Sequence, residues 1–163
     1  MPSATTFRVG DKVVYPHHGA AIIKSLEEKE FGGEKKQYYI LRLAYGDLTL
    51  MVPTDSTDEV GIRDVIKRDE LDKVFKVMKS KECRMPTNWS RRFKTHVEKL
   101  RSGDIYQVAE VVRNLARREA EKGLSAGEKR MLTKARQILV SEITFAAGVD
   151  ESEADKMIDN VLA

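Results

Sequence analysis

The chain has one cysteine, four prolines, three histidines and no long apolar run among its 163 residues. Cys83 cannot form an internal disulfide, and this favours a reducing compartment. No segment approaches the roughly 18 consecutive apolar residues typical of a transmembrane helix. The first residues, Met1 to Thr6, also lack the apolar core of a signal peptide. We therefore expect a cytoplasmic protein that does not enter the membrane.

Patterns for catalysis and metal binding are also missing. His17 and His18 precede a glycine in a predicted loop, but no further ligands stand at metal-binding spacing. Packing of a turn is the simpler interpretation of this pair. No glycine-rich phosphate-binding motif occurs, and no positioned base is evident for Cys83. We expect neither an enzyme nor a cofactor.

Charge is distributed unevenly along the chain. The formal net charge is only +3, yet residues 84–136 hold 14 Lys and Arg against 6 Asp and Glu, a net +8. Residues 142–163 hold 1 basic against 6 acidic residues, a net −5. A basic block of this size favours a polyanion partner for the middle of the chain, although charged helix faces are often only solvated.

The first 66 residues are predicted to form β structure. Short runs rich in β-branched and aromatic residues alternate there with turn residues. The pair Gly32–Gly33 between two such runs predicts a hairpin. Several short strands in so short a segment suggest a small antiparallel barrel or curled sheet. The predicted strands cover residues 12–15, 20–26, 37–44 and 48–52.

From about residue 67 the apolar residues recur with a helical period. Asp69 is a candidate N-cap, Ser125 and Glu128 fit a capping box, and Gly123 is placed to end a helix. We therefore predict an α+β protein, with a β module over residues 1–66 and an all-helical bundle over residues 67–163. The five helices are expected near residues 70–78, 87–100, 105–122, 126–143 and 151–162.

The segment Pro86–Lys94 holds the only tryptophan, at the predicted start of a helix and beside several cations. On spacing alone, Trp89 would begin an apolar stripe through Phe93 to Leu100 that faces a core. Alternatively, the later residues seat the helix and Trp89 overhangs the bundle as an apolar plate for nucleic acid. The first-turn amides of the helix could then also hold a phosphate.

Basic side chains form two strips, one following the tryptophan and one on the helix near residue 130. A third cluster at residues 113–118 carries less weight, because neighbouring glutamates could pair with it along the helix. Phosphate binding by the first two strips, with the tryptophan as a wedge, would suit a nucleic-acid partner. The candidate DNA-binding residues are Trp89, Arg91, Arg92, Lys94, Lys129, Arg130 and Lys134.

Several motifs carry a resemblance that spans nearly the whole chain in one register. The segments Gly10–Gly19, Gly46–Pro53 and Val60–Asp64 resemble the N-terminal module of the CarD/CdnL family of bacterial transcription regulators. The segments Pro86–Lys94 and Leu124–Leu132 resemble the C-terminal domain of that family, closest to actinobacterial CarD proteins. Each motif alone is weak, but together and in order they are specific.

The resemblance implies a Tudor-like β module that binds the β subunit of RNA polymerase. It also implies a helical domain that contacts promoter DNA near the upstream edge of the −10 element. Trp89 matches a tryptophan that wedges into the minor groove at the upstream fork of the bubble, while Arg91, Lys94 and Lys129 match contacts to the DNA backbone. The implied protein regulates transcription and associates with the nucleoid through polymerase, without catalysis or cofactor. Nothing demands a dimer, so we expect a monomer.

The resemblance also indicates polymerase-binding residues in the β module. Met51 departs from actinobacterial relatives, which carry arginine there, and agrees with myxobacterial relatives. Alternation in residues 48–52 places Met51 on the other face of the strand from Leu50 and Val52. This favours an outward side chain over a core position. Another departure is a lysine at position 29, where the closest relatives carry arginine. The candidate residues are Lys29, Phe31, Ile40, Met51 and Pro53.

Two other functions remain open at this stage. The helical part could bind duplex DNA or RNA independently of polymerase. The chain could instead be a protein adaptor, in which case the basic strips would be dispensable.

Overall fold

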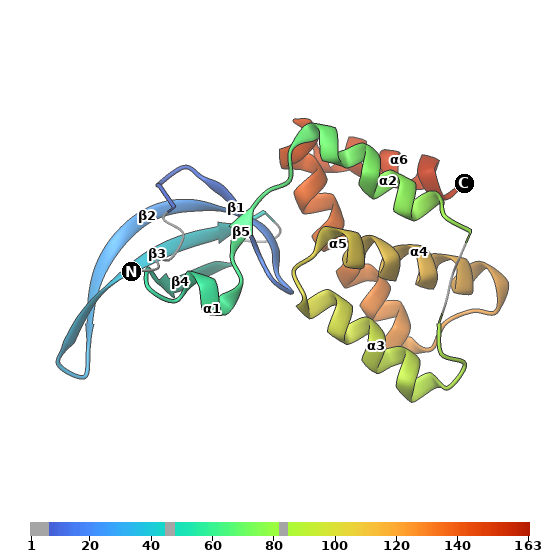
Figure 1. The fold of residues 1–163 in the computed structure, drawn as a ribbon, viewed down its shortest axis with the longest axis horizontal. Helices are drawn as coiled ribbons and strands as arrows, with labels where there is room; N and C mark the ends of the chain where they lie inside the picture. Colours follow the sequence, from blue (N-terminus) through green and yellow to red (C-terminus); the bar gives the residue numbers. More distant parts are fainter. Residues whose placement is uncertain (1–6, 45–47, 82–84) are drawn as a thin grey trace.

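The computed structural model describes residues 7–44, 48–81 and 85–163. Cys83, and the turn that the sequence suggests at residues 45–47, lie outside the described residues. Figure 1 shows a curved sheet on one side of the molecule and a group of helices on the other, joined by the segment after β5. The predicted α+β class, with the β module first, is confirmed.

The sheet has five antiparallel strands in the order β4-β3-β2-β1-β5. One face buries an apolar cluster that includes Val13, Ile23, Leu41 and Val52. The short helix α1 (Thr57–Val60) lies between β4 and β5 and was not predicted, because four residues are too few for a helical period. The strands are β1 (Lys12–Tyr15), β2 (Gly19–Phe31), β3 (Glu34–Leu43), β4 (Thr49–Pro53) and β5 (Arg63–Asp64).

The predicted hairpin at Gly32–Gly33 is confirmed. Both glycines have positive φ, 60° and 84°, as a two-residue turn of type I′ requires. The strands β2 and β3 continue to this turn and project away from the helices (Figure 1). Both are longer than predicted, because this outer part of the hairpin has largely exposed residues and therefore lacks apolar alternation.

In the described part of the chain, five helices follow the sheet, as predicted. They are α2 (Leu71–Lys79), α3 (Trp89–Arg101), α4 (Ile105–Glu121), α5 (Ala126–Ala147) and α6 (Glu151–Leu162). Their apolar stripes meet in one core that includes Val74, Leu115, Leu139 and Ile158. Among the described residues, no helix is long and apolar enough to cross a membrane.

Two local predictions for the helical part are corrected. Asp69 does not cap α2, because residues Arg68–Glu70 form a 3-10 turn that runs directly into the helix. The third basic cluster has a structural role: Arg113 donates to the carbonyl oxygen of Val77, and Arg117 donates to that of Met78. These guanidinium groups satisfy carbonyls at the end of α2, where cations are favoured.

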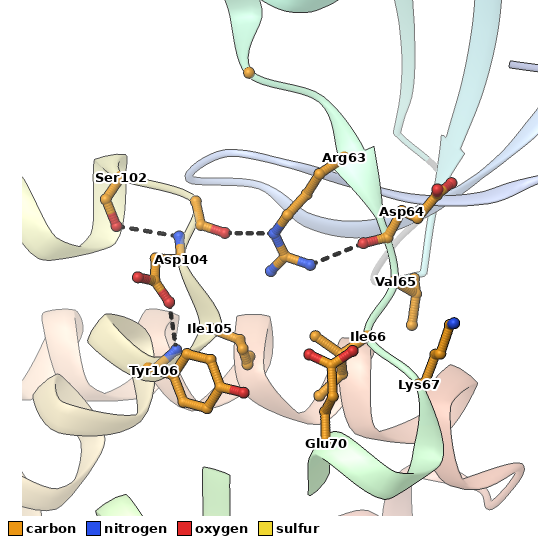
Figure 2. Close-up of a pocket in the computed structure, with 12 residues that line it drawn as sticks. Arg63, Asp64, Val65, Ile66, Lys67, Glu70, Ser102, Asp104, Ile105 and Tyr106 are labelled. Atoms are coloured by element: carbon orange, nitrogen blue, oxygen red, sulfur yellow. Dashed lines mark hydrogen bonds between the residues drawn. The ribbon is translucent and has the colours of Figure 1, made fainter. Parts of the chain in front are cut away.

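A polar clamp joins the sheet to the bundle. Glu142 of α5 is buried and accepts hydrogen bonds from Arg63 and from the backbone amide of Ile66. Figure 2 shows Arg63 pointing across a pocket toward the segment between α3 and α4, where its Nε donates to the carbonyl of Gly103 at 2.8 Å. The pocket encloses about 450 Å³. The side chains that line it come from both parts of the molecule, so the segment after β5 is anchored on the bundle.

Candidate nucleic-acid interface

The N-termini of α3 and α5 meet at one surface. Asn88 caps α3 by accepting a hydrogen bond from the backbone amide of Arg91 at 3.1 Å. Ser125 caps α5 by accepting from the amide of Glu128 at 3.2 Å. Both helix ends therefore contribute partial positive charge to the same region, which favours anions there.

Trp89 joins these two helix ends and remains exposed. Its indole Nε1–H donates to Ser125 Oγ at 3.0 Å, and its ring stacks on Phe93 with centroids 5.0 Å apart and an interplanar angle of 18°. Nevertheless, 46% of Trp89 is accessible. Of the two interpretations of the tryptophan, the structure favours the overhanging plate over the core residue, since Phe93 and Leu100 seat the helix instead.

Arg92 differs from the expectation that it contacts DNA. It is only 2% exposed, and its guanidinium donates to Glu128 at 2.8 Å and to the carbonyl of Thr87 at 3.1 Å. The hydrogen bond from Arg92 lowers the pKa of the Glu128 carboxyl. A guanidinium held inside by a carboxylate is not available to a phosphate, so Arg92 holds the two helix N-termini together.

The other candidate cations surround the tryptophan. Arg91 and Lys94 are exposed on α3, and Lys129 and Arg130 are exposed on α5. Lys134 is half-buried beside a groove of about 280 Å³ between the two helices. The groove is lined by His17, Phe93, Val97, Leu100, Gly127, Arg130, Met131 and Lys134. The structure therefore brings both predicted basic strips to one surface, with an apolar floor between them.

Sequence reasoning missed some residues of this surface. Arg92 lies eight residues before Leu100, on the same face of the helix, so the helical period could have indicated an inward position. Its partner Glu128 could not be identified from the sequence, because the two are 36 positions apart. His17 was interpreted only as part of a turn, and its place in the groove depends on how the sheet meets the bundle.

The five candidate polymerase-binding residues share one face of the sheet. Strand register pairs Ile40 with Met51, and neighbours directly opposite in a sheet point to the same side. The pairs Tyr38–Pro53, Lys29–Lys36 and Phe31–Glu34 continue the same face, because strand residues alternate sides. Tyr38, which sequence reasoning did not single out, lies within this face and contacts the ring of Phe31.

This face carries exposed apolar side chains next to the outer edge of β4, the last strand among the described residues. Met51 is 45% exposed and Phe31 57% exposed, so the predicted outward orientation of Met51 is confirmed. Leu48, expected to share the inner face with Leu50 and Val52, lies before the strand and is exposed. β4 is the last strand of the sheet, and such an edge can pair with an extended segment of another protein.

Comparisons with known proteins agree with the two-part architecture. Residues 7–66 match the family model of the CarD-like/TRCF RID domain, and residues 73–159 match that of the CarD C-terminal domain. YdeB of Bacillus subtilis (strain 168), named as a candidate transcription factor, is 40% identical over 147 residues, which cover 90% of this chain and 96% of YdeB.

One solved structure is similar to part of this chain. It is the solution structure of the 72-residue N-terminal domain of Myxococcus xanthus CarD, with 30% sequence identity and a TM-score of 0.31. The match covers 39% of this chain and 89% of that domain. With both family models matched in order and a relative of similar length, this chain belongs to the CarD-like family of bacterial transcription factors.

Proposed function

We propose that this protein binds the β subunit of RNA polymerase through its sheet and binds promoter DNA at the upstream edge of the bubble through its helices. Trp89 would insert into the minor groove at the fork and stabilise the open complex. The match to the RID domain supports the polymerase interaction. The single observation that carries the DNA-binding part is the exposed, pre-oriented indole of Trp89 at a basic surface.

The rigidity of the indole supports a wedge. Stacking on Phe93 and the hydrogen bond to Ser125 hold one ring face against the protein, so little side-chain freedom is left to lose on binding. Partial unstacking of a base step costs about a few kcal/mol, which contact with an inserted apolar ring can offset. At a promoter fork, opening has already disrupted the stack, so insertion there is easier than into closed duplex.

Selective affinity for the fork is what would shift promoter opening. A ligand that binds open and closed DNA equally shifts no equilibrium, however tightly it binds. The exposed cations, Arg91, Lys94, Lys129 and Arg130, would hold backbone phosphates present in both states. Trp89 would supply the difference in affinity between open and closed DNA, and the cations would hold the protein in position on the DNA.

The sheet would raise the local concentration of the helical part at the promoter. A protein already bound to polymerase meets the fork as an intramolecular event, so the helices need little affinity for DNA of their own. Anchoring of the segment after β5 by Glu142 would keep the direction of Trp89 fixed relative to the polymerase-binding face.

The decisive experiment follows promoter opening by bacterial RNA polymerase with a fluorescent base in the bubble. We expect wild type to increase the open complex, and Trp89→Ala to lose most of that increase while still binding polymerase. Trp89→Phe keeps an aromatic plate but not the hydrogen bond to Ser125, and should retain part of the effect.

Each alternative gives a different result in this assay. A helical module that acts independently of polymerase would bind free DNA or RNA with a dependence on Trp89, yet leave opening unchanged. A protein adaptor would tolerate the charge reversals Arg91→Glu and Lys94→Glu without consequence. Absence of any wild-type effect on opening, at concentrations that saturate polymerase, would refute the proposed function.

A further inference from the structure

The turn between β1 and β2 carries His17 and His18 into the helical surface. This turn is held from two sides of the bundle. Pro16 packs on the α3–α4 connection so closely that a Cβ on Gly103 would lie 3.0 Å from its ring. On the other side, the backbone amide of Ala20 donates to Ser141 Oγ of α5 at 2.9 Å. The sheet thus places a fixed loop at the end of the groove between α3 and α5.

His17 adopts a conformation that few residues accept. Its φ is 71°, and it is the only non-glycine residue with positive φ in the described part of the chain. Histidine, asparagine and aspartate tolerate this left-handed region better than most residues, but at some cost in strain. The result is an exposed imidazole at the end of the groove opposite Trp89.

The neighbours of His17 are cationic. Burial lowers the pKa of His17, and the charges of Lys134, His18 and Arg101 lower it further. Lys134 also lowers the pKa of His18, after burial. The described residues that line the groove include Arg130 and Lys134 but no carboxylate. Glu98, one turn before Arg101 on α3, is exposed and is not part of this lining. The cluster therefore lacks a counter-charge in its own groove.

Unbalanced positive charge on Arg101 and Lys134, beside a fixed and exposed imidazole that can donate an N–H group in its neutral form, suits a polyanion. Arg101 lies twelve residues after Trp89 on α3, which corresponds to about 18 Å at 1.5 Å per residue. One DNA strand carries a phosphate about every 3.4 Å along the helix axis, so the two positions are about five phosphates apart. With α3 along the duplex axis, a wedge at the fork and this cluster would contact the same duplex.

We propose that the β1–β2 turn, through His17 and His18, forms with Arg101 and Lys134 a second phosphate-binding site for duplex DNA, about five base pairs from the base step at Trp89. The DNA-binding surface then spans both parts of the molecule instead of the helices alone. The proposal rests on the proposed function, because it takes the fork at Trp89 as the origin of the duplex.

The test uses the full chain at low salt with two fork DNAs, whose duplex arms are about 3 and about 12 base pairs long and whose strands are covalently cross-linked within the arm so that they stay annealed. NMR detects weak binding through chemical shifts of the imidazole of His17 and the indole of Trp89. With the long arm, both side chains should shift. With the short arm, only Trp89 should shift, because the duplex ends before it reaches His17.

Variants separate this site from general electrostatic attraction. His17→Asn retains a residue that tolerates positive φ, and Arg101→Gln removes one charge. We expect each to weaken binding of the long-arm DNA about threefold or more, and Arg101→Gln to lower the salt-dependence slope by about one. Neither should alter binding of the short-arm DNA. Lys156→Gln on the exposed face of α6 is the matched control, and it should change binding of neither the long-arm nor the short-arm DNA.

Failure of this proposal is distinguishable from failure of the proposed function. A shift of Trp89 with no shift of His17 on the long arm would overturn the second site and leave the wedge intact. A shift of His17 with no shift of Trp89 would support a phosphate-binding site at the turn. It would also show that Trp89 does not bind the fork, and the stated spacing from Trp89 would then be wrong. If neither side chain shifts at low salt, both proposals are wrong.

Discussion

Both terminal guanidinium nitrogens of Arg63 lie 2.7 Å from the carboxylate oxygens of Glu142, and this bidentate pair connects the sheet to α5. The carboxylate is 1% exposed and also accepts the amide of Ile66 at 2.9 Å. Two planar groups that are joined by two parallel hydrogen bonds have little freedom to rotate relative to each other. This acidic residue thus contributes, together with the β1–β2 turn, to the position of the sheet relative to the bundle.

Glu142→Gln should loosen this junction. The amide presents N–H groups to a guanidinium that itself only donates, so at least one contact is lost. We expect the free energy of unfolding to fall by about 1–3 kcal/mol. Spin labels on Lys36 and Lys122, introduced as cysteines in a Cys83→Ser background, should report a broader distance distribution between sheet and bundle. Glu153→Gln, exposed on α6, should leave both unchanged, and equal effects of the two variants would contradict the role of Glu142.

Arg91 and Arg92 should respond in opposite ways to the same substitution. Arg92→Met leaves Glu128 buried without its partner, which costs about 3–5 kcal/mol in comparable pairs. Arg91→Met removes an exposed charge, so we expect stability to change by less than about 0.5 kcal/mol while affinity for DNA falls. Urea unfolding and DNA titration measure the two effects.

A double variant tests whether the loss comes from the uncompensated carboxylate. Arg92→Met with Glu128→Leu should recover much of the stability lost in Arg92→Met, because a buried ion pair can often be replaced by apolar side chains. Simple addition of the two single losses would contradict this explanation.

His96 should make stability depend on pH. It is 1% exposed, and burial, followed by the charge of Lys99, lowers its pKa from 6.5 to about 4. The folded state thus favours the neutral ring, whereas the unfolded chain binds a proton near pH 6.5. The stabilising free energy from the neutral ring is therefore fully present above pH 6.5 and is lost as pH falls toward 4. By linkage, about 2 kcal/mol should be lost between pH 7.5 and 5.

His96→Gln removes the titrating group and isolates its effect. The variant should lose less stability than wild type over the same pH interval, whatever its stability at pH 7.5. Urea unfolding at both pH values provides the comparison. An identical loss in both proteins would exclude His96 as the cause.

Met51→Glu should weaken polymerase binding without unfolding the sheet. The side chain is 45% exposed on the shared outer face, so the fold tolerates a charge there. If this face meets an apolar surface of the β subunit, we expect at least about tenfold lower affinity, or about 1.4 kcal/mol. Asn160→Glu on α6 adds the same charge at an exposed position and should bind normally. Unchanged affinity of Met51→Glu would place the interface elsewhere.

The sequence by itself determined most of the elements, though not the short α1 and β5, and most of the candidate surface. The two periods, alternation in the sheet and about 3.6 residues in the helices, are local properties, so they predicted the five helices and the outward side of Met51. The glycine pair at residues 32 and 33 is equally local and predicted the hairpin. Local composition also marked Trp89 and the two basic strips. Boundaries failed where the local pattern was absent, as in the outer part of β2 and β3 and in the 3-10 turn before α2.

Only the tertiary structure decided which charges are free and which are bound inside. Arg91 and Arg92 are adjacent and identical, yet one is exposed and the other is paired with a carboxylate 36 positions away. Likewise, Arg63 meets Glu142 across 79 positions, and His17 meets the groove through the docking of the sheet. Electrostatic interactions require a short distance in space. Residues far apart in the chain come this close only when the two parts of the molecule pack together.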